Sequence, residues 1–431
     1  MRRINIGLIG LGNIGCGVVK ILQQRRSLIA QKIGIEILIK RICDKDILAK
    51  RDVRLDKDCL SRNVNDVLDD PQIDIVVELI GGIDPARDFI LGALKKGKHV
   101  VTANKALLAE HGNELFAVAA ERGKNIYFEA SVGAGIPIIK SIKEGLVANK
   151  FSSVFGIVNG TSNYVLTQMS KENCSLSSAI KSAQNKGFAE KNPTLDIEGV
   201  DSAHKLALLT YLAFGKIVAL KDIFIEGISQ ISSADIAYAK DLGYEIKLLA
   251  IAKKEADELE VRVHPTLLPR EHLLSSVDGV FNAIYATSDL AGELMFYGPG
   301  AGQLSAASGV VSDIVDLTQD IKAGLFRPTL NSIEDSSIKG LRKIDEFENR
   351  YYIRIMAVDK PGVLAKISGI LSKFGISIAS VTQKERLQSR VVPVVMVTHE
   401  VKEKNMRLAL KMIDKLQEIK DKSVAIRIEG V

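Results

Sequence analysis

The sequence predicts an α/β protein with three parts: a doubly wound parallel sheet, an α+β part with a mixed sheet, and a small C-terminal βαββαβ domain. An apolar run at residues 4–9 ends in a glycine-rich turn and leads into helical spacing. Alternating strand and helix patterns then continue to about residue 130, and residues 350–431 contain a separate set of short strands and helices. At 431 residues the chain is too long for one ordinary core, so two or three domains are expected.

Composition narrows the class of protein. With 46% hydrophobic and 26% charged residues, the chain is typical of a globular protein. Its net charge of +6 forms no dense basic block, so we expect no nucleic-acid partner, and no apolar run approaches the roughly 20 residues of a membrane span. Four scattered cysteines without a CxxC pair indicate reduced thiols in a cytoplasmic protein. Arg2 and Arg3 before an apolar stretch resemble a short signal peptide, but the closely spaced glycines fit a strand and turn better.

Residues 1–130 read as a dinucleotide-binding domain of the Rossmann type. The strand at Ile4–Ile9 is followed by a GxGxxG turn and a helix, which is the context in which this motif is informative. Its glycines let a pyrophosphate approach backbone amides at the start of the helix. The candidate cofactor-binding residues in the turn are Gly10, Leu11, Gly12, Asn13, Ile14 and Gly15.

The second strand, Ile35–Ile42, ends near the place where an acid would hold the ribose 2′-hydroxyl of NAD. Lys40 and Arg41 stand there instead, and Asp44 follows shortly after. Two cations favour the 2′-phosphate of NADP, with NAD as the alternative. The simpler interpretation, that both side chains point into water, stays open.

Further strands are expected at Asp74–Ile80, His99–Thr102 and Asn125–Ala130, with a helix at Ala86–Lys95. Lys105 comes just after the strand at His99–Thr102, where doubly wound sheets bind their ligands. On spacing alone, a surface lysine that starts a helix is the better interpretation of this residue.

Residues 131–301 form the predicted second domain. It opens with a glycine-rich stretch that spacing alone would interpret as a tight hinge. Expected strands and helices follow, and a second glycine-rich loop, for which a phosphate-cradling role is one interpretation, then leads into a further helix. The elements expected in this part are strands at Phe155–Asn159, Ile223–Ile231, Leu259–His264 and Ala283–Thr287, and helices from about Asp201, at Gly243–Ala252 and at Gln303–Leu317.

Residues 183–205 carry the most specific pattern in the chain. Four carboxylates and a closing lysine lie between helical segments, and Asp201 and Lys205 are four residues apart, which puts them on one helical face. Ionisable groups at the edge of an apolar helix suit a site that grips a zwitterion and moves a proton. The stretch resembles the signature of homoserine dehydrogenases at fixed spacings: Ala183, Gly187, Phe188, Ala189, Asn192, Pro193, Asp196, Ile197, Gly199, Asp201 and Lys205.

The resemblance covers nearly the whole chain and implies a reaction. Members of this family reduce L-aspartate 4-semialdehyde to L-homoserine with NADPH, on the route to threonine, isoleucine and methionine. By analogy, Lys205 supplies the proton, and Lys105, in a segment similar to the family's VTANK, is the second catalytic candidate next to the cofactor. Glu190, Asp196 and Asp201 are the implied substrate-binding residues.

Three further expectations rest on the resemblance. A monovalent cation, commonly sodium, would be held by Glu129 and the carbonyls of Val132, Ala134 and Ile136. The chain would return to the first domain at about residues 302–320, with Gly302 near the cofactor. The middle sheet would form a subunit interface in a homodimer or homotetramer.

The C-terminal domain, residues 350–431, follows a polar linker at 321–349 and opens with Asp359-Lys-Pro-Gly362-Val363-Leu364. The βαββαβ order of its elements and this DxPGVL motif resemble the ACT regulatory domain, which commonly binds an amino acid. Threonine is the expected inhibitor. The regulatory candidates are Asp359, Gly362, Val363 and Leu364, with backbone amides at the helix start taking a carboxylate. A purely structural role in oligomerisation is the alternative.

Two rival functions remain at this point. A Rossmann-fold amino-acid dehydrogenase would act on an amine and release or consume ammonia. An amino-acid sensor would keep the fold without catalysis, but Glu190, Asp201 and Lys205 are all present.

Overall fold

The structure is a computed structural model and describes residues 2–327, 337–383 and 391–430. The chain divides into two compact units, which are described separately. Unit 1 contains residues 1–154, 203–221 and 280–335, and unit 2 contains residues 155–202, 222–279 and 336–431, within the described ranges. The boundaries predicted for the individual domains stay a prediction.

Unit 1 is built on a six-stranded parallel sheet in the order β3-β2-β1-β4-β5-β6, the doubly wound order of a Rossmann fold. The predicted fold class of this part is therefore confirmed. Its elements are β1 (Arg2–Ile9), α1 (Asn13–Gln24), α2 (Arg26–Ile33), β2 (Ile35–Cys43), β3 (Leu60–Ser61), α3 (Asn65–Leu68), β4 (Ile75–Glu78), α4 (Ala86–Lys95), β5 (His99–Thr102), α5 (Lys105–Glu121) and β6 (Ile126–Tyr127).

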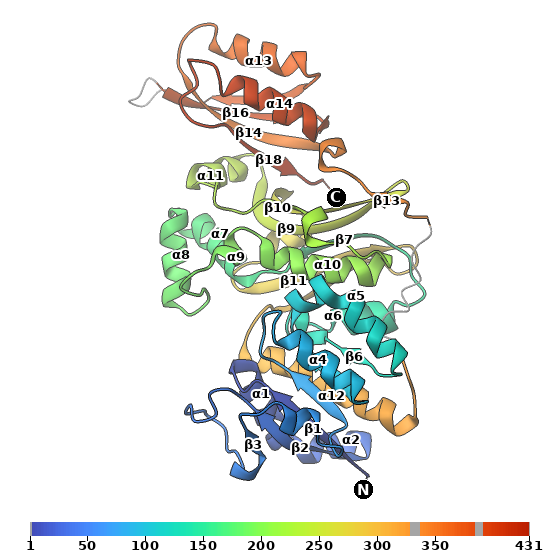
Figure 1. Ribbon diagram of the computed structural model, residues 1–431. Coiled ribbons are helices and arrows are strands. Elements are labelled where there is room, and N and C mark those ends of the chain that lie inside the picture. Colours follow the sequence, from blue (N-terminus) through green and yellow to red (C-terminus); the bar gives the residue numbers. More distant parts are fainter. Residues whose placement is uncertain (1, 328–336, 384–390, 431) are drawn as a thin grey trace. The chain divides into compact units, whose positions relative to one another are not determined.

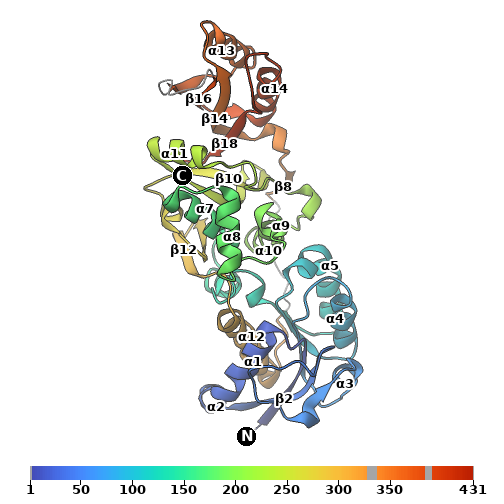
Figure 2. The ribbon, with the colours of Figure 1, turned by 90° about the vertical axis from the view of Figure 1, so that its left-hand side faces the viewer.

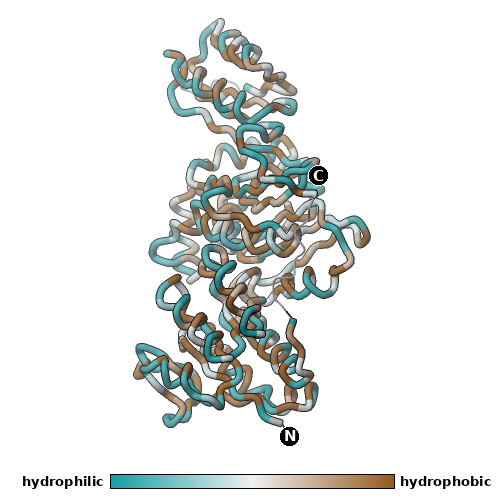
Figure 3. The backbone as a smooth tube through the Cα atoms, turned by 45° about the vertical axis from the view of Figure 1, so that its right-hand side comes forward, coloured by the Kyte–Doolittle hydropathy of each residue, from teal (hydrophilic) through white to brown (hydrophobic). Residues whose placement is uncertain are grey.

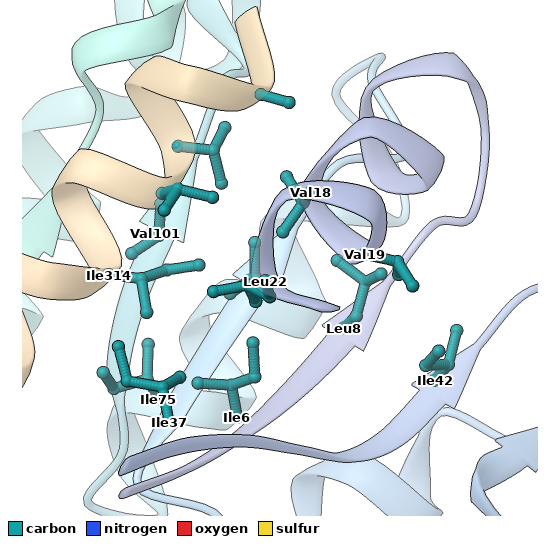
Figure 4. Close-up of a cluster of buried hydrophobic side chains, with 14 of the residues drawn as sticks. Ile6, Leu8, Val18, Val19, Leu22, Ile37, Ile42, Ile75, Val101 and Ile314 are labelled. Carbon is teal, nitrogen blue, oxygen red and sulfur yellow. The ribbon is translucent and has the colours of Figure 1, made fainter. Parts of the chain in front are cut away.

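A distant helix, α12 (Gln303–Ala323), completes the core of this sheet. Figures 1 and 2 show α12 beside α1 although about 280 residues separate them in the sequence. In Figure 4, Val18 and Leu22 of α1 and Ile314 of α12 meet strand residues Ile6 and Ile75. The predicted return of the chain to the first domain thus has an apolar basis, because α12 buries its own face against the nucleotide-binding sheet.

Unit 1 also contains elements that are not part of this sheet or of the helices packed on it. It includes most of α10 (Val200–Phe214), which lines a small cavity together with α5. The other elements are η2 (Glu129–Ser131), α6 (Ile138–Lys140), a π-helical turn η3 (Ser141–Gly145), η4 (Leu220–Asp222, at the unit boundary) and the hairpin of β11 (Phe281–Ser288) with β12 (Gly292–Pro299).

Unit 2 contains a mixed sheet in the order β7-β9-β10-β18-β14-β16-β15, with β8 and β13 also paired to β10. Its C-terminal part has the order β14-α13-β15-β16-α14-β18 around its own apolar core, so the predicted βαββαβ arrangement is confirmed. The elements are β7 (Phe151–Ile157, which starts in unit 1), α7 (Gly160–Glu172), α8 (Leu176–Asn185), α9 (Thr194–Ile197), β8 (Phe224–Ile225), α11 (Ser233–Asp241), β9 (Tyr244–Glu255), β10 (Glu258–Pro269), η5 (Leu273–Ser276), β13 (Gly340–Leu341), η6 (Ile344–Glu346), β14 (Glu348–Val358), α13 (Val363–Lys373), β15 (Ile378–Gln383), β16 (Val391–Thr398), β17 (Val401–Lys402), α14 (Glu403–Ile413) and β18 (Val424–Ile428).

Some predicted elements of unit 2 are wrong. The helix expected at Gly243–Ala252 is the strand β9, which pairs with β10 along all twelve of its residues. The strand expected at Ile223–Ile231 is present only as the two-residue strand β8. The sequence prediction also missed α11 and β12. Part of the predicted linker at 321–349 lies outside the described residues, and its described part includes β13 and η6.

Buried ion pairs connect the C-terminal strands of unit 2 to β10. Arg262 of β10 is 1% exposed and donates to Asn349 Oδ1 at 3.1 Å and to the Glu429 carboxylate. Arg427 of β18 donates to both oxygens of Glu403, at 2.9 and 2.8 Å, and to Glu226 Oε2 at 2.8 Å. Charges buried in this way are stabilising only while each partner is present.

Figure 3 shows hydrophobic and hydrophilic residues interspersed along both units. Among the described helices, none combines the length and apolar character needed to cross a membrane.

We expect Arg262→Ala to lower the free energy of unfolding by about 3–5 kcal/mol, because it leaves the buried Glu429 carboxylate without its arginine partner. Urea unfolding followed by far-UV circular dichroism measures the loss. The control is Arg270→Ala, which removes a half-exposed arginine 3.5 Å from Glu245 and should cost at most about 1 kcal/mol. Equal losses in the two variants would contradict this role for the buried pairs.

Candidate active site

The glycine turn that follows β1 needs its glycines for steric reasons. Gly10 has a φ of 99°, and a Cβ there would lie 2.8 Å from the backbone of Leu79. A Cβ on Gly15 would lie 2.3 Å from the carbonyl oxygen of Gly10. Gly12 caps α1, whose first amides have no partner within the helix and therefore suit a phosphate. The structure thus places the predicted residues 10–15 in a turn that can take a pyrophosphate.

The start of α12 lies beside this turn. Gln303 Nε2 donates to Asn13 Oδ1 at 3.0 Å, and a Cβ on Gly17 would lie 2.8 Å from that of Ala307. Gly302 caps α12 with a φ of 132°, a conformation that favours glycine. Gly302, which is predicted to lie near the cofactor, is therefore adjacent in sequence to Gln303, which contacts the glycine turn directly.

A buried hydrogen-bond network holds the segment before Lys105. Glu78, at the end of β4, is fully buried, and its carboxylate accepts from Thr102 Oγ1 at 2.6 Å and from the amide of Ile80 at 2.8 Å. The Asn104 amide donates to Thr102 Oγ1 at 3.0 Å, and the Asn104 side chain caps α5. Burial raises the pKa of Glu78, although these donors oppose the shift. The network fixes Lys105 as the first residue of α5.

Lys205 lies in the second turn of α10 and is buried, at 8% exposure. Its neighbour His204 places its Nε2 3.8 Å from Glu110 Oε1 on α5. Lys105, at the start of α5, and Lys205, in the second turn of α10, therefore belong to neighbouring helices of unit 1.

The acidic residues cluster in unit 2 around Asn159. This side chain donates to Asp196 Oδ1 at 2.6 Å and to Asp201 Oδ2 at 2.9 Å, while its own oxygen caps α7 by accepting from the Ser162 amide. Asp201 is 9% exposed and precedes Lys205 by one turn of the same helix. Glu190 is exposed on the loop between α8 and α9, where no contact joins it to this cluster among the hydrogen bonds described here.

Glu129 lies in the predicted cation-binding turn and is 5% exposed. Its two carboxylate oxygens accept from the amides of Ile139 and Lys140, both at 2.8 Å, and its own amide donates to Asp313 Oδ2 of α12 at 2.8 Å. Burial raises the pKa of Glu129 to about 7. A desolvated carboxylate held in this way fits a cation ligand.

The backbone beside Glu129 is also suited to a cation. Gly133 and Ala134 have φ values of 70° and 55°, so the turn that contains Val132, Ala134 and Ile136 has two successive left-handed residues. The carbonyl oxygens in this turn are hard donors of the kind that sodium prefers. No group of three or more His, Cys, Asp or Glu side chains with metal-binding geometry occurs among the described residues, so a cation here would depend on carbonyls.

Two sets of predicted residues lie away from these clusters. Arg41 lies two residues before the end of β2 and donates to the Asp58 carbonyl from NH1. In the C-terminal part, Gly362 caps α13 with a φ of 88°, Val363 is buried and Leu364 is 42% exposed, while Asp359 precedes them in a loop.

Sequence reasoning missed the residues that hold these groups in place: Glu78, Thr102, Asn159 and Asp313. Each acts on a partner at least 24 residues away, so no local pattern identifies it. The sequence predicts Asn159 only as the last residue of a strand, and its double role as cap and carboxylate partner depends on the fold.

Comparisons with known proteins agree along the whole chain. Family models described as the homoserine dehydrogenase NAD binding domain, homoserine dehydrogenase and the ACT domain match residues 10–129, 137–315 and 351–418. Homoserine dehydrogenase of Helicobacter pylori is 43% identical over 429 residues, with full coverage of both chains. That of Bacillus subtilis is 41% identical over 432 residues, covering 100% of this chain and 99% of the relative.

Solved structures give the same result. A homoserine dehydrogenase of Thiobacillus denitrificans has a TM-score of 0.90 at 41% identity, covering 100% of this chain and 99% of its own. A hyperthermophilic archaeal homoserine dehydrogenase in complex with NADPH has a TM-score of 0.63 at 26% identity, covering 75% of this chain and 100% of its own.

Proposed function

The chain belongs to the homoserine dehydrogenase family, and from this premise we propose that it reduces L-aspartate 4-semialdehyde to L-homoserine with NADPH in the synthesis of threonine, isoleucine and methionine. The observation that carries the proposal is the cluster of Asn159, Asp196 and Asp201 one helical turn before Lys205. A carboxylate cluster followed by a lysine suits a substrate with an ammonium group and an aldehyde that needs a proton.

The bound nicotinamide would supply the hydride, and the residues of this chain supply position and charge. Lys205 donates the proton to the aldehyde oxygen, and Lys105, held by the Glu78 network, is the second candidate. Asp196 and Asp201 bind the substrate and keep Lys205 oriented. Glu190, on the exposed loop between α8 and α9, holds the ammonium group.

NADPH is the proposed cofactor. The glycine turn supports binding of the pyrophosphate, and the archaeal relative solved with NADPH supports the phosphorylated form. Arg41 contributes positive charge on the adenosine side, and cofactor titrations of an Arg41→Ala variant measure its effect.

We propose a homodimer or homotetramer as the active species, because the family resemblance implies that the middle sheet forms a subunit interface. Size-exclusion chromatography with light scattering tests it, and a monomer that retains full activity would contradict it.

Lys205→Ala is expected to lower turnover at least about 100-fold, the effect typical of losing a positioned general acid. NADPH oxidation with aspartate semialdehyde measures the rate. Lys216→Ala, just beyond the end of α10, is the control and should keep the wild-type rate. Wild-type turnover in a folded Lys205→Ala enzyme would remove Lys205 from the mechanism. Activity that depends on ammonia would instead favour an amino-acid dehydrogenase.

We propose that sodium binds Glu129 and the carbonyls of Val132, Ala134 and Ile136. Sodium should raise the melting temperature of the wild-type protein more than equal concentrations of choline, because an ion that binds only the folded state stabilises it. The Glu129→Gln variant should show no difference between the two salts. A sodium effect that survives in this variant would place the ion elsewhere.

We propose that threonine inhibits the enzyme by binding the ACT domain at Asp359 and the start of α13 after Gly362. A coupling free energy of about 1–3 kcal/mol would change apparent affinity roughly 5- to 150-fold. Deleting residues from Asn349 onward is a poor test, because Arg262 would lose Asn349 and Glu429.

The sharper test is Asp359→Ala, which should weaken threonine inhibition at least about fivefold while the uninhibited rate stays unchanged. Steady-state inhibition curves at several threonine concentrations measure it, with Glu400→Ala, in the exposed turn after β16 at the opposite end of β14, as the control. Equal inhibition of all three proteins would exclude Asp359 from the effector site, and no inhibition of the wild type at millimolar threonine would exclude threonine.

A further inference from the structure

Asp44 is the first residue after β2 and is tied to the glycine turn. Its Oδ2 accepts a hydrogen bond from the amide of Leu11 at 2.6 Å. Its Oδ1 accepts from Arg51 NH2 at 3.0 Å and from the Asp46 amide at 2.8 Å. The side chain of Asp44 is 13% exposed, so this carboxylate is held in one place beside the cofactor turn.

Arg51 completes a closed ring of contacts with the same turn. Its Nε donates to the carbonyl of Leu11 at 2.8 Å, and its NH1 donates to the Ala49 carbonyl at 3.1 Å. The Arg51 side chain is 11% exposed. Asp44 thus binds the amide of Leu11, Arg51 binds the carbonyl of the same residue, and the two side chains bind each other. A guanidinium has five N–H donors, so these three bonds do not exhaust Arg51.

This ring of contacts lies at the end of the second strand, where doubly wound folds recognise the ribose of the cofactor. In doubly wound folds an acid at the end of the second strand holds the ribose 2′-hydroxyl of NAD, whereas an arginine nearby accommodates the 2′-phosphate of NADP. This chain has both groups at that place, paired with each other. Each group would have to exchange its partner for the cofactor that it binds.

Resting on the proposed function, we propose that the Asp44–Arg51 pair selects the cofactor. Arg51 leaves Asp44 to bind the 2′-phosphate of NADP, and Asp44 exchanges the Leu11 amide or Arg51 for the 2′-hydroxyl of NAD. The preference of the enzyme is then set by competition within one ion pair, and each partner favours a different cofactor.

Arg41 is less well placed for this role. It is level with Gly7 of β1, three residues before the first glycine of the turn, and lines a cavity of about 350 Å³ with Asp56 and Asp58. Its NH1 donates to the Asp58 carbonyl. Two carboxylates beside it oppose the approach of a phosphate, so Arg41 has an auxiliary effect at most.

Replacing Arg51 and replacing Asp44 should change the preference between NADPH and NADH in opposite directions. Arg51→Ala should weaken NADPH binding about 10- to 100-fold, the loss expected for a charge-assisted hydrogen bond, and change NADH binding less than about threefold. Asp44→Asn keeps an acceptor for the Leu11 amide but frees Arg51 from the opposing charge, so NADPH should bind at least as tightly and NADH several-fold more weakly. Titration of the cofactors' own fluorescence with the full-length protein gives the four dissociation constants.

Two further variants act as controls. Arg54→Ala removes an exposed cation three residues along the same loop and should change neither constant. Arg41→Ala measures the auxiliary effect, and a larger loss of NADPH there than in Arg51→Ala would overturn the proposal. Melting temperatures of all variants show whether the glycine turn is intact.

The outcomes separate the inference from the proposed function. Equal weakening of both cofactors in Arg51→Ala would show that the ring only holds the turn, and would overturn the proposal. A shift of the NADPH-to-NADH ratio in the same direction for both variants would also overturn it. If the wild type binds cofactor but does not reduce aspartate semialdehyde, the proposed function fails, while the binding constants still decide the role of the pair.

Discussion

The packing of α12 on the nucleotide-binding sheet is the constraint on which the rest of unit 1 depends. One end of this helix touches the glycine turn through Gln303 and Asn13. Further along, Asp313 holds the Glu129 amide and Asp316 pairs with Lys140 at 2.7 Å. The same rigid element therefore fixes the phosphate-binding turn and the turn proposed to bind a cation. Its apolar face supplies the free energy, and its few polar groups set the register.

The sequence was a good guide wherever one local pattern determines one element. The glycine turn was found because its spacing and its place between strand and helix are set by steric contacts within the turn itself. The strand β9 was mistaken for a helix because its leucine- and alanine-rich run is buried on both faces and has no period of two. Pairing with β10 decided its structure, and pairing partners leave no local trace.

The candidate site divides in the same way. Lys105, Asp201 and Lys205 were found because a motif or a helical spacing marks them. The groups that hold them were not found, since Glu78 and Asn159 act through partners that only the fold brings near. Buried polar networks of this kind join residues that are far apart in the sequence and that only the fold brings together. A motif therefore identifies the reacting groups more readily than the residues that position them.

The buried ion pairs of unit 2 bear on how an effector could act. β10 and β18 pair in parallel; Arg262 joins the two sides of this seam through the buried Glu429 carboxylate, and Arg427 joins them through the partly exposed Glu226. Separating the seam would break both ion pairs together with the backbone pairing of β10 and β18. An effector at α13 therefore cannot act by simply detaching the ACT domain from β10. It has to bias an arrangement in which these pairs stay formed, so small shifts of packed elements are the more economical route to inhibition.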